Sequence, residues 1–204
     1  ELAIRGYVES FFNKPDSNVR LGITRAGNVI GGGDWAYDRI VPDCMNAWSR
    51  GLKVDIRNPQ ATRPWQHVLE PLSGYLAFAV NLTNESFNHG KAYNFGPTSI
   101  QNYPVSELID EMSKYWKQVK WSDVSKKEAH PHEAGLLKLN CDKVLLDLDW
   151  RPTLEFKETV KMTVEWYKKY YQNKEKSLYN FSIAQINKYI QLAKSRNIAW
   201  TKND

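Results

Sequence analysis

Apolar residues dominate the segment 19–30, VRLGITRAGNVI, in which two Arg and one Asn interrupt a run of Val, Leu, Ile, Thr and Ala. Such a run predicts a strand that is buried on both faces. It ends in three glycines, Gly31 to Gly33, followed by Asp34 and Trp35. Because this glycine backbone would lie at the carboxyl edge of a sheet, we expect it to approach a bound phosphate or sugar closely. The glycines match neither GxGxxG nor a Walker P-loop.

The pattern alternates between strand and helix up to Gly96 and is mostly helical afterwards. Residues 1–13 have helical periodicity without an N-cap, which predicts a helix that starts upstream of this chain. Further strands are predicted at 53–57, 63–68, 92–95, 119–121 and 136–139, and further helices at 45–50, 70–82, 105–116, after Asn140, from Thr153 to near Asn173, and from the capping box at Ser182 onward. This order predicts the tail of a parallel-sheet α/β domain followed by a smaller, mostly helical lobe.

Composition narrows the class of protein. With 204 residues, of which 42% are apolar, the chain can bury one sizeable core. The net charge is +5, but Lys and Arg are interspersed with Asp and Glu, whereas a nucleic-acid-binding surface is more densely basic. Cys44 and Cys141 are isolated, which predicts two reduced thiols in a cytoplasmic protein. Because the basic residues are dispersed, we expect no nucleic-acid partner. Because the sequence shows neither a membrane-spanning run nor a signal peptide, we expect no membrane partner.

The hexapeptide RPWQHV at 63–68 is the most unusual chemical pattern in the chain. In an extended strand, Arg63, Trp65 and His67 share one face. A guanidinium beside an indole can hold a phosphate by bidentate hydrogen bonds, or it can stack on the indole where two domains meet. His67 is either a catalytic base or a structural histidine in a half-buried strand.

Single polar residues elsewhere allow two interpretations each. Asn28, close to the end of the first predicted strand, contacts either a ligand or neighbouring backbone. Arg39 and Arg57 face either solvent or an anionic ligand. Asp34 and Glu70 are isolated carboxylates that form no acid/base pair.

His130, His132 and Glu133 have the alternate spacing that a metal site can use. Pro131 separates the two histidines, and no third convincing ligand is present. The pattern therefore favours contact with a ligand or with a helix terminus, and we predict no metal site.

Five segments together resemble the CDP-glucose 4,6-dehydratases, a family of extended short-chain dehydrogenase/reductases. They are RAGNVIGGGDWAYDRIVPD, IRNPQATRPWQHVLEPLSGYL, AYNFGP, HEAGLLKLNCDKV and LDWRPTLEFKETVKMTVEWY, in collinear order over residues 1–171. The stretch RPWQHVLEPL is far more specific than a lone glycine loop. The resemblance implies an NAD(P)-binding, Rossmann-like fold in which 1–35 and 64–96 are remaining strands and helices. Residues 36–63 and 97–204 would then form the nucleotide-sugar-binding lobe.

The resemblance also implies roles for individual residues, with Asn28 and Arg63 at the pyrophosphate of CDP-glucose. The implied substrate-binding set is Asn28, Arg39, Val41, Ile56, Arg57, Asn58, Arg63, His132 and Glu133, and the set implied near the nicotinamide of NAD is Ala26, Gly27, Asn28 and Val29. The family reaction moves a hydride from the sugar C4 to NAD, eliminates water across C5 and C6, and returns the hydride to C6. The implied setting is deoxysugar synthesis for lipopolysaccharide O-antigen.

Family members carry GxxGxxG, an acidic pair for dehydration and Tyr-x-x-x-Lys upstream of the part that this chain resembles. The resemblance therefore implies a substrate-side portion that has no catalytic residue of its own, needs the missing N-terminal half, and dimerises through the helix at 1–13. Two alternatives remain open. One is a non-catalytic nucleotide-sugar-binding or assembly module, and the other is a related nucleotide-sugar epimerase, against which RPWQHV argues.

Overall fold

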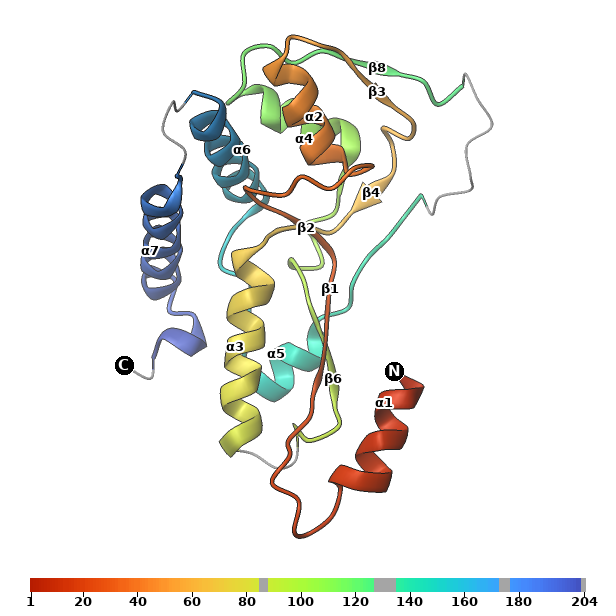
Figure 1. The fold of residues 1–204 in the computed structure, drawn as a ribbon, viewed down its shortest axis with the longest axis vertical. Coiled ribbons are helices and arrows are strands. Elements are labelled where there is room, and N and C mark those ends of the chain that lie inside the picture. The colour runs from red at the N-terminus through yellow and green to blue at the C-terminus, as the bar shows by residue number, and fades with distance from the viewer. Residues whose placement is uncertain (85–87, 127–134, 173–176, 203–204) are drawn as a thin grey trace.

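The structure is a computed structural model that describes residues 1–84, 88–126, 135–172 and 177–202. Figure 1 shows an elongated molecule with an upper and a lower part, which meet near β2. The helices are α1 (Leu2–Tyr7), the π-helical turn η1 (Val8–Phe12), α2 (Ile40–Ser49), α3 (Leu69–Asn84), α4 (Val105–Ser113), α5 (Asp142–Leu148), α6 (Phe156–Gln172), α7 (Tyr179–Ser195) and the 3₁₀ turn η3 (Ala199–Thr201). The strands are β1 (Ile23–Ala26), β2 (Asn28–Ile30), β3 (Val54–Ile56), β4 (Thr62–Arg63), β5 (Trp65–His67), β6 (Ala92–Phe95), β7 (Tyr103–Pro104) and β8 (Trp121–Asp123).

The described strands form four pairs. β1 pairs with β6, β2 with β5 and β3 with β8, all in parallel, whereas β4 pairs with β7 in antiparallel. The lower part in Figure 1 contains β1, β6, α3 and α5, and the upper part contains α2, α4, β3 and β8. Parallel strands joined by helices confirm the predicted α/β class.

The prediction of one continuous strand over 19–30 is wrong. The chain forms β1 and β2, which are separated at Gly27 and pair with different strands. β1 is also not buried on both faces, because Arg25 is exposed and, within the described residues, the strand has β6 as its one hydrogen-bonded neighbour. The predicted strand 63–68 breaks in the same way, since Pro64 separates β4 from β5 and has no backbone N–H for a ladder.

Other boundaries also differ from the prediction. α2 begins at Ile40, whereas the helix was predicted from Met45. The segment 136–139 forms a single bridge, from Thr62 to Leu136, instead of a strand. α7 begins at Tyr179, so Ser182 is not its cap; the Ser182 hydroxyl instead accepts a hydrogen bond from Trp166 Nε1 at 3.0 Å. Thr153 does not cap α6, because α6 begins at Phe156; the backbone N–H of Thr153 instead donates to a buried carboxylate in α3.

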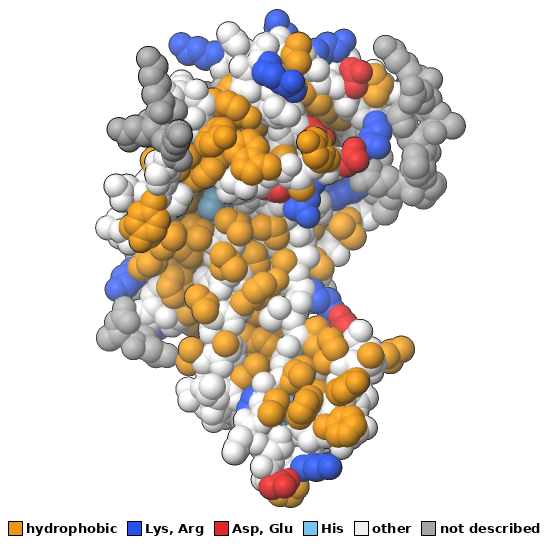
Figure 2. Space-filling view, viewed as in Figure 1, with side chains coloured by type: hydrophobic (Ala, Val, Ile, Leu, Met, Phe, Trp, Pro, Cys, Tyr) orange, Lys and Arg blue, Asp and Glu red, His pale blue; other side chains and the backbone are white. Residues whose placement is uncertain are grey.

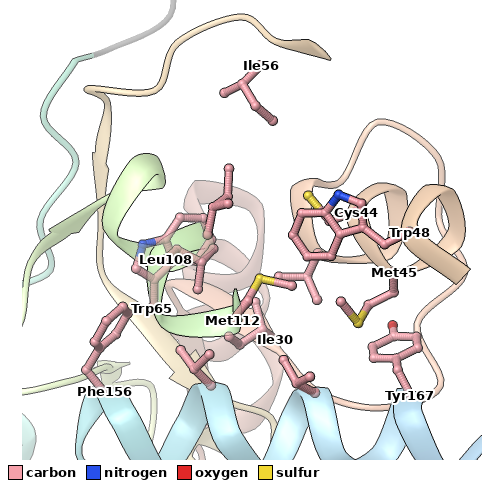
Figure 3. Packing of buried hydrophobic residues seen from close by; sticks show 14 residues of the cluster. Ile30, Cys44, Met45, Trp48, Ile56, Trp65, Leu108, Met112, Phe156 and Tyr167 are labelled. Atoms are coloured by element: carbon pink, nitrogen blue, oxygen red, sulfur yellow. The ribbon is translucent and has the colours of Figure 1, made fainter. Parts of the chain in front are cut away.

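Each of the two parts has its own main cluster of buried side chains, and a third, small cluster of Leu154, Met162 and Tyr189 joins α6 to α7. The larger main cluster packs α2, α4 and α6 around Trp48, Met45, Leu108 and Tyr167 (Figure 3). The smaller main cluster joins α3 to β6 and α5 in the lower part and includes Phe78, Tyr93, Phe95, Val144 and Trp150. Each large apolar side chain buried in this way stabilises the fold by about 1.5–3 kcal/mol.

A long apolar stripe on α3 stays exposed. Leu72, Leu76 and Val80 follow each other at intervals of four residues, and they are 47%, 70% and 60% exposed. Figure 2 shows apolar side chains over much of the visible lower part, where Figure 1 places α1 and α3. None of the helices in the described part of the chain combines the length and apolarity needed to cross a bilayer.

Glu70 ties the C-terminal helices to α3. Its side chain is 1% exposed and accepts hydrogen bonds from the backbone N–H groups of Thr153 and Leu154 and from the Tyr189 hydroxyl. Burial raises the pKa of Glu70 to about 7, although these three donors oppose the rise. Sequence analysis described Glu70 as isolated, and the structure corrects this, because its carboxylate has three hydrogen-bond donors.

The free energy of unfolding should therefore depend on Glu70 between pH 4.5 and 7. Because the folded state keeps the proton at pH values where the unfolded chain releases it, stability falls as the pH rises, by about 3 kcal/mol over this window. Glu70→Gln keeps an acceptor for the two N–H groups and should remove this part of the slope. Glu70→Ala leaves both donors unsatisfied and should cost about 1–3 kcal/mol for each of them at any pH. Urea melts at several pH values measure both effects, and an unchanged slope in Glu70→Gln would contradict the assignment.

Candidate functional site

A cleft of about 540 Å³ opens where the two parts meet. The first part of its wall is residues 27–31, which include β2. The rest comes from the loop before α2 and its first turn, from β3 with the two residues after it, and from β4 and β5. The lining residues are Gly27, Asn28, Val29, Ile30, Gly31, Asp34, Asp38, Arg39, Ile40, Val41, Pro42, Asp43, Val54, Asp55, Ile56, Arg57, Asn58, Arg63, Trp65 and Val105.

Asn28, Arg63 and Trp65 come together in this wall because β2 runs beside β5. Asn28 is the register partner of Trp65, and Arg63 lies two residues earlier on β4. Arg63 is 6% exposed and donates to the carbonyl of Thr62 at 2.8 Å, and Trp65 Nε1 donates to the carbonyl of Tyr103 at 2.9 Å. A buried guanidinium beside an amide side chain can bind an anionic group.

The N-terminus of α2 faces the same cleft. Ile40 to Asp43 line it, and no side chain caps the helix at Arg39. Helix N-terminal N–H groups lack intrahelical partners and carry a partial positive charge, and the carboxylate of Asp43 in this first turn offsets part of that charge.

The loop before α2 is held by its own charges. Asp34 accepts from the Ala36 N–H at 3.0 Å and from Arg39 Nη1 at 3.2 Å, and Asp38, which has a φ of +59°, lies 3.9 Å from Arg57. Both arginines are exposed, so these pairs order the rim of the cleft and contribute little to stability.

Seven of the predicted substrate-binding residues line this single cleft. They are Asn28, Arg39, Val41, Ile56, Arg57, Asn58 and Arg63. His132 and Glu133, with His130, lie outside the described residues. Of the set predicted near the nicotinamide, Gly27, Asn28 and Val29 line the cleft, whereas Ala26 is the last residue of β1 and does not. The binding roles of both sets stay predictions.

Two features that the sequence suggested for the site, the full glycine run and His67, do not line the cleft. Only the first of the three glycines lines it, because Gly32 and Gly33 lie against Trp166 of α6. His67 is 2% exposed and does not share the cleft with Arg63 and Trp65; burial lowers its pKa to about 4, and its Nδ1 accepts from the Leu69 N–H at 3.3 Å. A deeply buried histidine away from the cleft is a structural residue.

Asp43 and Asp55 are cleft residues that sequence analysis missed. Asp43 lies two positions after Val41 of the predicted substrate-binding set, and Asp55 lies within the predicted strand 53–57. Recognising that α2 starts at Ile40 would have placed Asp43 in its first turn. Within the described ranges, no group of three His, Cys, Asp or Glu side chains is placed to hold a metal ion.

The described residues fit only one end of an NAD molecule. Backbone at Gly27 to Val29 lines the cleft, and the register partner of Val29 is Gln66, whose buried Oε1 has no hydrogen-bond partner. The glycine run after β2 leads into a loop and lies against Trp166, so it forms no phosphate-cradling turn for a dinucleotide.

Known proteins match this chain over part of their length. The chain is 42% identical over 172 residues to the CDP-glucose 4,6-dehydratase of Salmonella typhimurium, a match that covers 82% of this chain and 47% of the relative. The chain is a partial homologue of CDP-glucose 4,6-dehydratase. It is also 25% identical over 190 residues to the dTDP-D-glucose 4,6-dehydratase of Mus musculus, covering 90% of this chain and 51% of the relative. No protein-family model matches the chain.

Solved structures confirm the extended short-chain dehydrogenase/reductase fold. The UDP-glucuronic acid 4-epimerase of Bacillus cereus, in complex with UDP-glucuronic acid and NAD, superposes with a TM-score of 0.67 at 15% identity, over 82% of this chain and 49% of that one. The dTDP-glucose 4,6-dehydratase of Bacillus anthracis, in complex with NAD, gives 0.59 at 18% identity, over 82% and 49%. The chain thus spans about half the length of the proteins it matches.

A side chain at Gly32 should disturb the support of the cleft. A Cβ there would lie 2.0 Å from Trp166 Cγ, so Gly32→Ala forces the indole away and should cost about 1–3 kcal/mol or more. Gly135→Ala is the matched control, because a Cβ at that position meets nothing within 4 Å. Thermal melts of both variants check this, and equal melting temperatures would show that the contact with Trp166 is not restrictive.

Proposed function

We propose that this chain is the substrate-binding portion of an NAD-dependent nucleotide-sugar 4,6-dehydratase, with CDP-glucose as its substrate. The observation that carries the proposal is the cleft in which the buried Arg63, Asn28 and the N-terminus of α2 converge. The 42% identity to a protein named CDP-glucose 4,6-dehydratase supports this substrate over those of the epimerases, whose likeness supports the fold alone.

The charge pattern of the cleft favours a ligand with localised negative charge. Four aspartates and three arginines line it, so the cleft as a whole does not attract anions. Arg63 and Asn28 lie close together, since Asn28 is the register partner of Trp65, and they supply donors that suit the diphosphate. Apolar side chains of Val41 and Ile56, on α2 and β3, supply a region that suits the base.

The described residues of the cleft would bind and orient the nucleotide-sugar, but they lack the side chains that would carry out the reaction. It contains no Tyr, Lys, His or Cys side chain, and its only titratable acids are aspartates. NAD, when bound in the complete enzyme, supplies the acceptor for the hydride. In this proposal the catalytic groups and most of the NAD site belong to a complementary half, and this chain has no turnover on its own.

The lower part of the molecule offers a surface for that half. Within the described residues, one edge of β1 carries no strand, and the apolar stripe of Leu72, Leu76 and Val80 on α3 is exposed. An unpaired parallel strand beside an apolar helix face fits the continuation of a Rossmann-type sheet. We assign residues 1–35 and 64–96 to that domain and 36–63 and 97–204 to the substrate lobe. A homodimer, a cytoplasmic location and a role in O-antigen deoxysugar synthesis follow from the same family assignment.

Replacing Arg63 should weaken binding of CDP. Arg63→Ala removes a charge-assisted contact of about 1.5–3 kcal/mol, which lowers affinity by at least about tenfold. Arg50→Ala removes the same charge from the exposed far end of α2 and should bind CDP as the unmodified chain does. Isothermal titration measures the three affinities, with thermal melts to confirm folding, and equal affinity for Arg63→Ala and Arg50→Ala would exclude Arg63 from the site.

Activity should appear only when the complementary half is present. The N-terminal segment of the Salmonella typhimurium relative that this chain does not match, co-expressed with this chain, should restore NAD-dependent conversion of CDP-glucose to its 4-keto-6-deoxy product. Neither piece alone should do so, as followed by absorbance of the keto sugar. A stable complex that binds CDP-glucose without turnover would instead favour a non-catalytic binding module.

A further inference from the structure

Asp43 differs from the other acidic residues of the cleft because its carboxylate has no partner. Asp34 accepts from Arg39, Asp38 lies near Arg57, and Asp55 accepts from the Ser122 hydroxyl at 2.5 Å. In the described part of the chain, no side chain or backbone N–H donates to the Asp43 carboxylate, and no cation lies within ion-pair distance of it.

The surroundings of Asp43 make an unpartnered acceptor costly. The residue is half-buried in the first turn of α2. Burial and the neighbouring Asp38 raise the pKa of the Asp43 carboxyl, while Arg57 opposes the rise. A partly desolvated carboxylate without a donor favours a ligand that brings an N–H or O–H group to it.

The position of Asp43 favours the base end of a nucleotide over its phosphates. A carboxylate repels a diphosphate, which Arg63 and Asn28 attract elsewhere in the same cleft. Asp43 and Val41 on α2 line the cleft together with Ile56 on β3, and Val41 and Ile56 belong to the larger apolar cluster. This side of the cleft therefore combines an apolar edge with one unpartnered carboxylate, which suits a base better than a phosphate.

Among pyrimidines, cytosine carries an amino group at the position where uracil and thymine carry a carbonyl oxygen. A carboxylate accepts from the amino group and repels the carbonyl oxygen, so it discriminates by attraction and repulsion together. We propose that Asp43 is the residue that selects cytosine nucleotides, by accepting a hydrogen bond from the cytosine N4 amino group. This inference rests on the proposed function, because it names the specificity of the same cleft.

The test is the ratio of CDP to UDP affinity in the full chain, measured by isothermal titration. The unmodified chain should prefer CDP by about tenfold or more, which corresponds to about 1.4 kcal/mol. Asp43→Asn is nearly isosteric and can accept from an amino group or donate to a carbonyl, so CDP and UDP should then bind almost equally. Asp110→Asn makes the same change on an exposed part of α4 outside the cleft and should keep the preference.

The ratio of CDP to UDP affinity distinguishes a failure of this inference from a failure of the proposed function. A general effect of the lost charge changes both affinities together and leaves the ratio unaltered. If CDP is preferred and Asp43→Asn keeps that preference, the proposed function stands and Asp43 instead contacts a group that both ligands share, such as a ribose hydroxyl. If CDP and UDP bind the unmodified chain equally, the selection is overturned. If neither binds it, the proposed function of the isolated chain fails and the selection fails with it.

Discussion

The contact between Gly27 and Pro64 determines where the cleft forms. A Cβ on Gly27 would lie 2.9 Å from Pro64 Cγ and 2.9 Å from Leu139, so the two chain segments can cross only with glycine at this point. Pro64 has no N–H, and its strand changes partners there, from β7 to β2. β1 and β2 change partners at Gly27 in the same way, from β6 to β5. Two strands that exchange partners at one crossing bring Asn28 and Arg63 to the same wall.

Helix α6 packs against the loop that continues from this wall after β2. Trp166 packs on Gly32 and Gly33, and the Tyr167 hydroxyl donates to the carbonyl of Asp34 at 2.6 Å. The backbone of the loop before α2 is thereby fixed, and the loop's charged side chains form the cleft rim. Glu70 extends the support, because it holds the turn before α6 through Thr153 and Leu154 and holds α7 through Tyr189. Gly32 and Gly33 therefore allow close packing against Trp166, and only Gly31 lines the cleft.

The sequence predicted the helices and strands better than the contacts between residues that are far apart in the chain. Apolar runs located β1, β2 and β6, and the resemblance named Arg63, Asn28 and five other residues that share one cleft. Local patterns could not reveal that Gly32 meets Trp166, because these residues are far apart in the chain and an indole can pack almost anywhere. Glu70 was called isolated for the same reason, since its donors are more than eighty residues away. Asp43 was missed because the start of α2 was placed five residues too late.

The cleft and the exposed surface of the lower part depend on different parts of the chain. Every described residue that lines the cleft lies between Gly27 and Arg63, apart from Trp65 and Val105. The side chains that support this span belong to the larger apolar cluster, which includes Trp48, Leu108 and Tyr167. The unpaired edge of β1 and the exposed stripe of α3 lie in the lower part, where the smaller cluster holds the fold. The cleft is thus formed within a chain that spans about half the length of its relatives. Under the proposed function, the groups for hydride transfer would come from a partner on the unpaired side of β1.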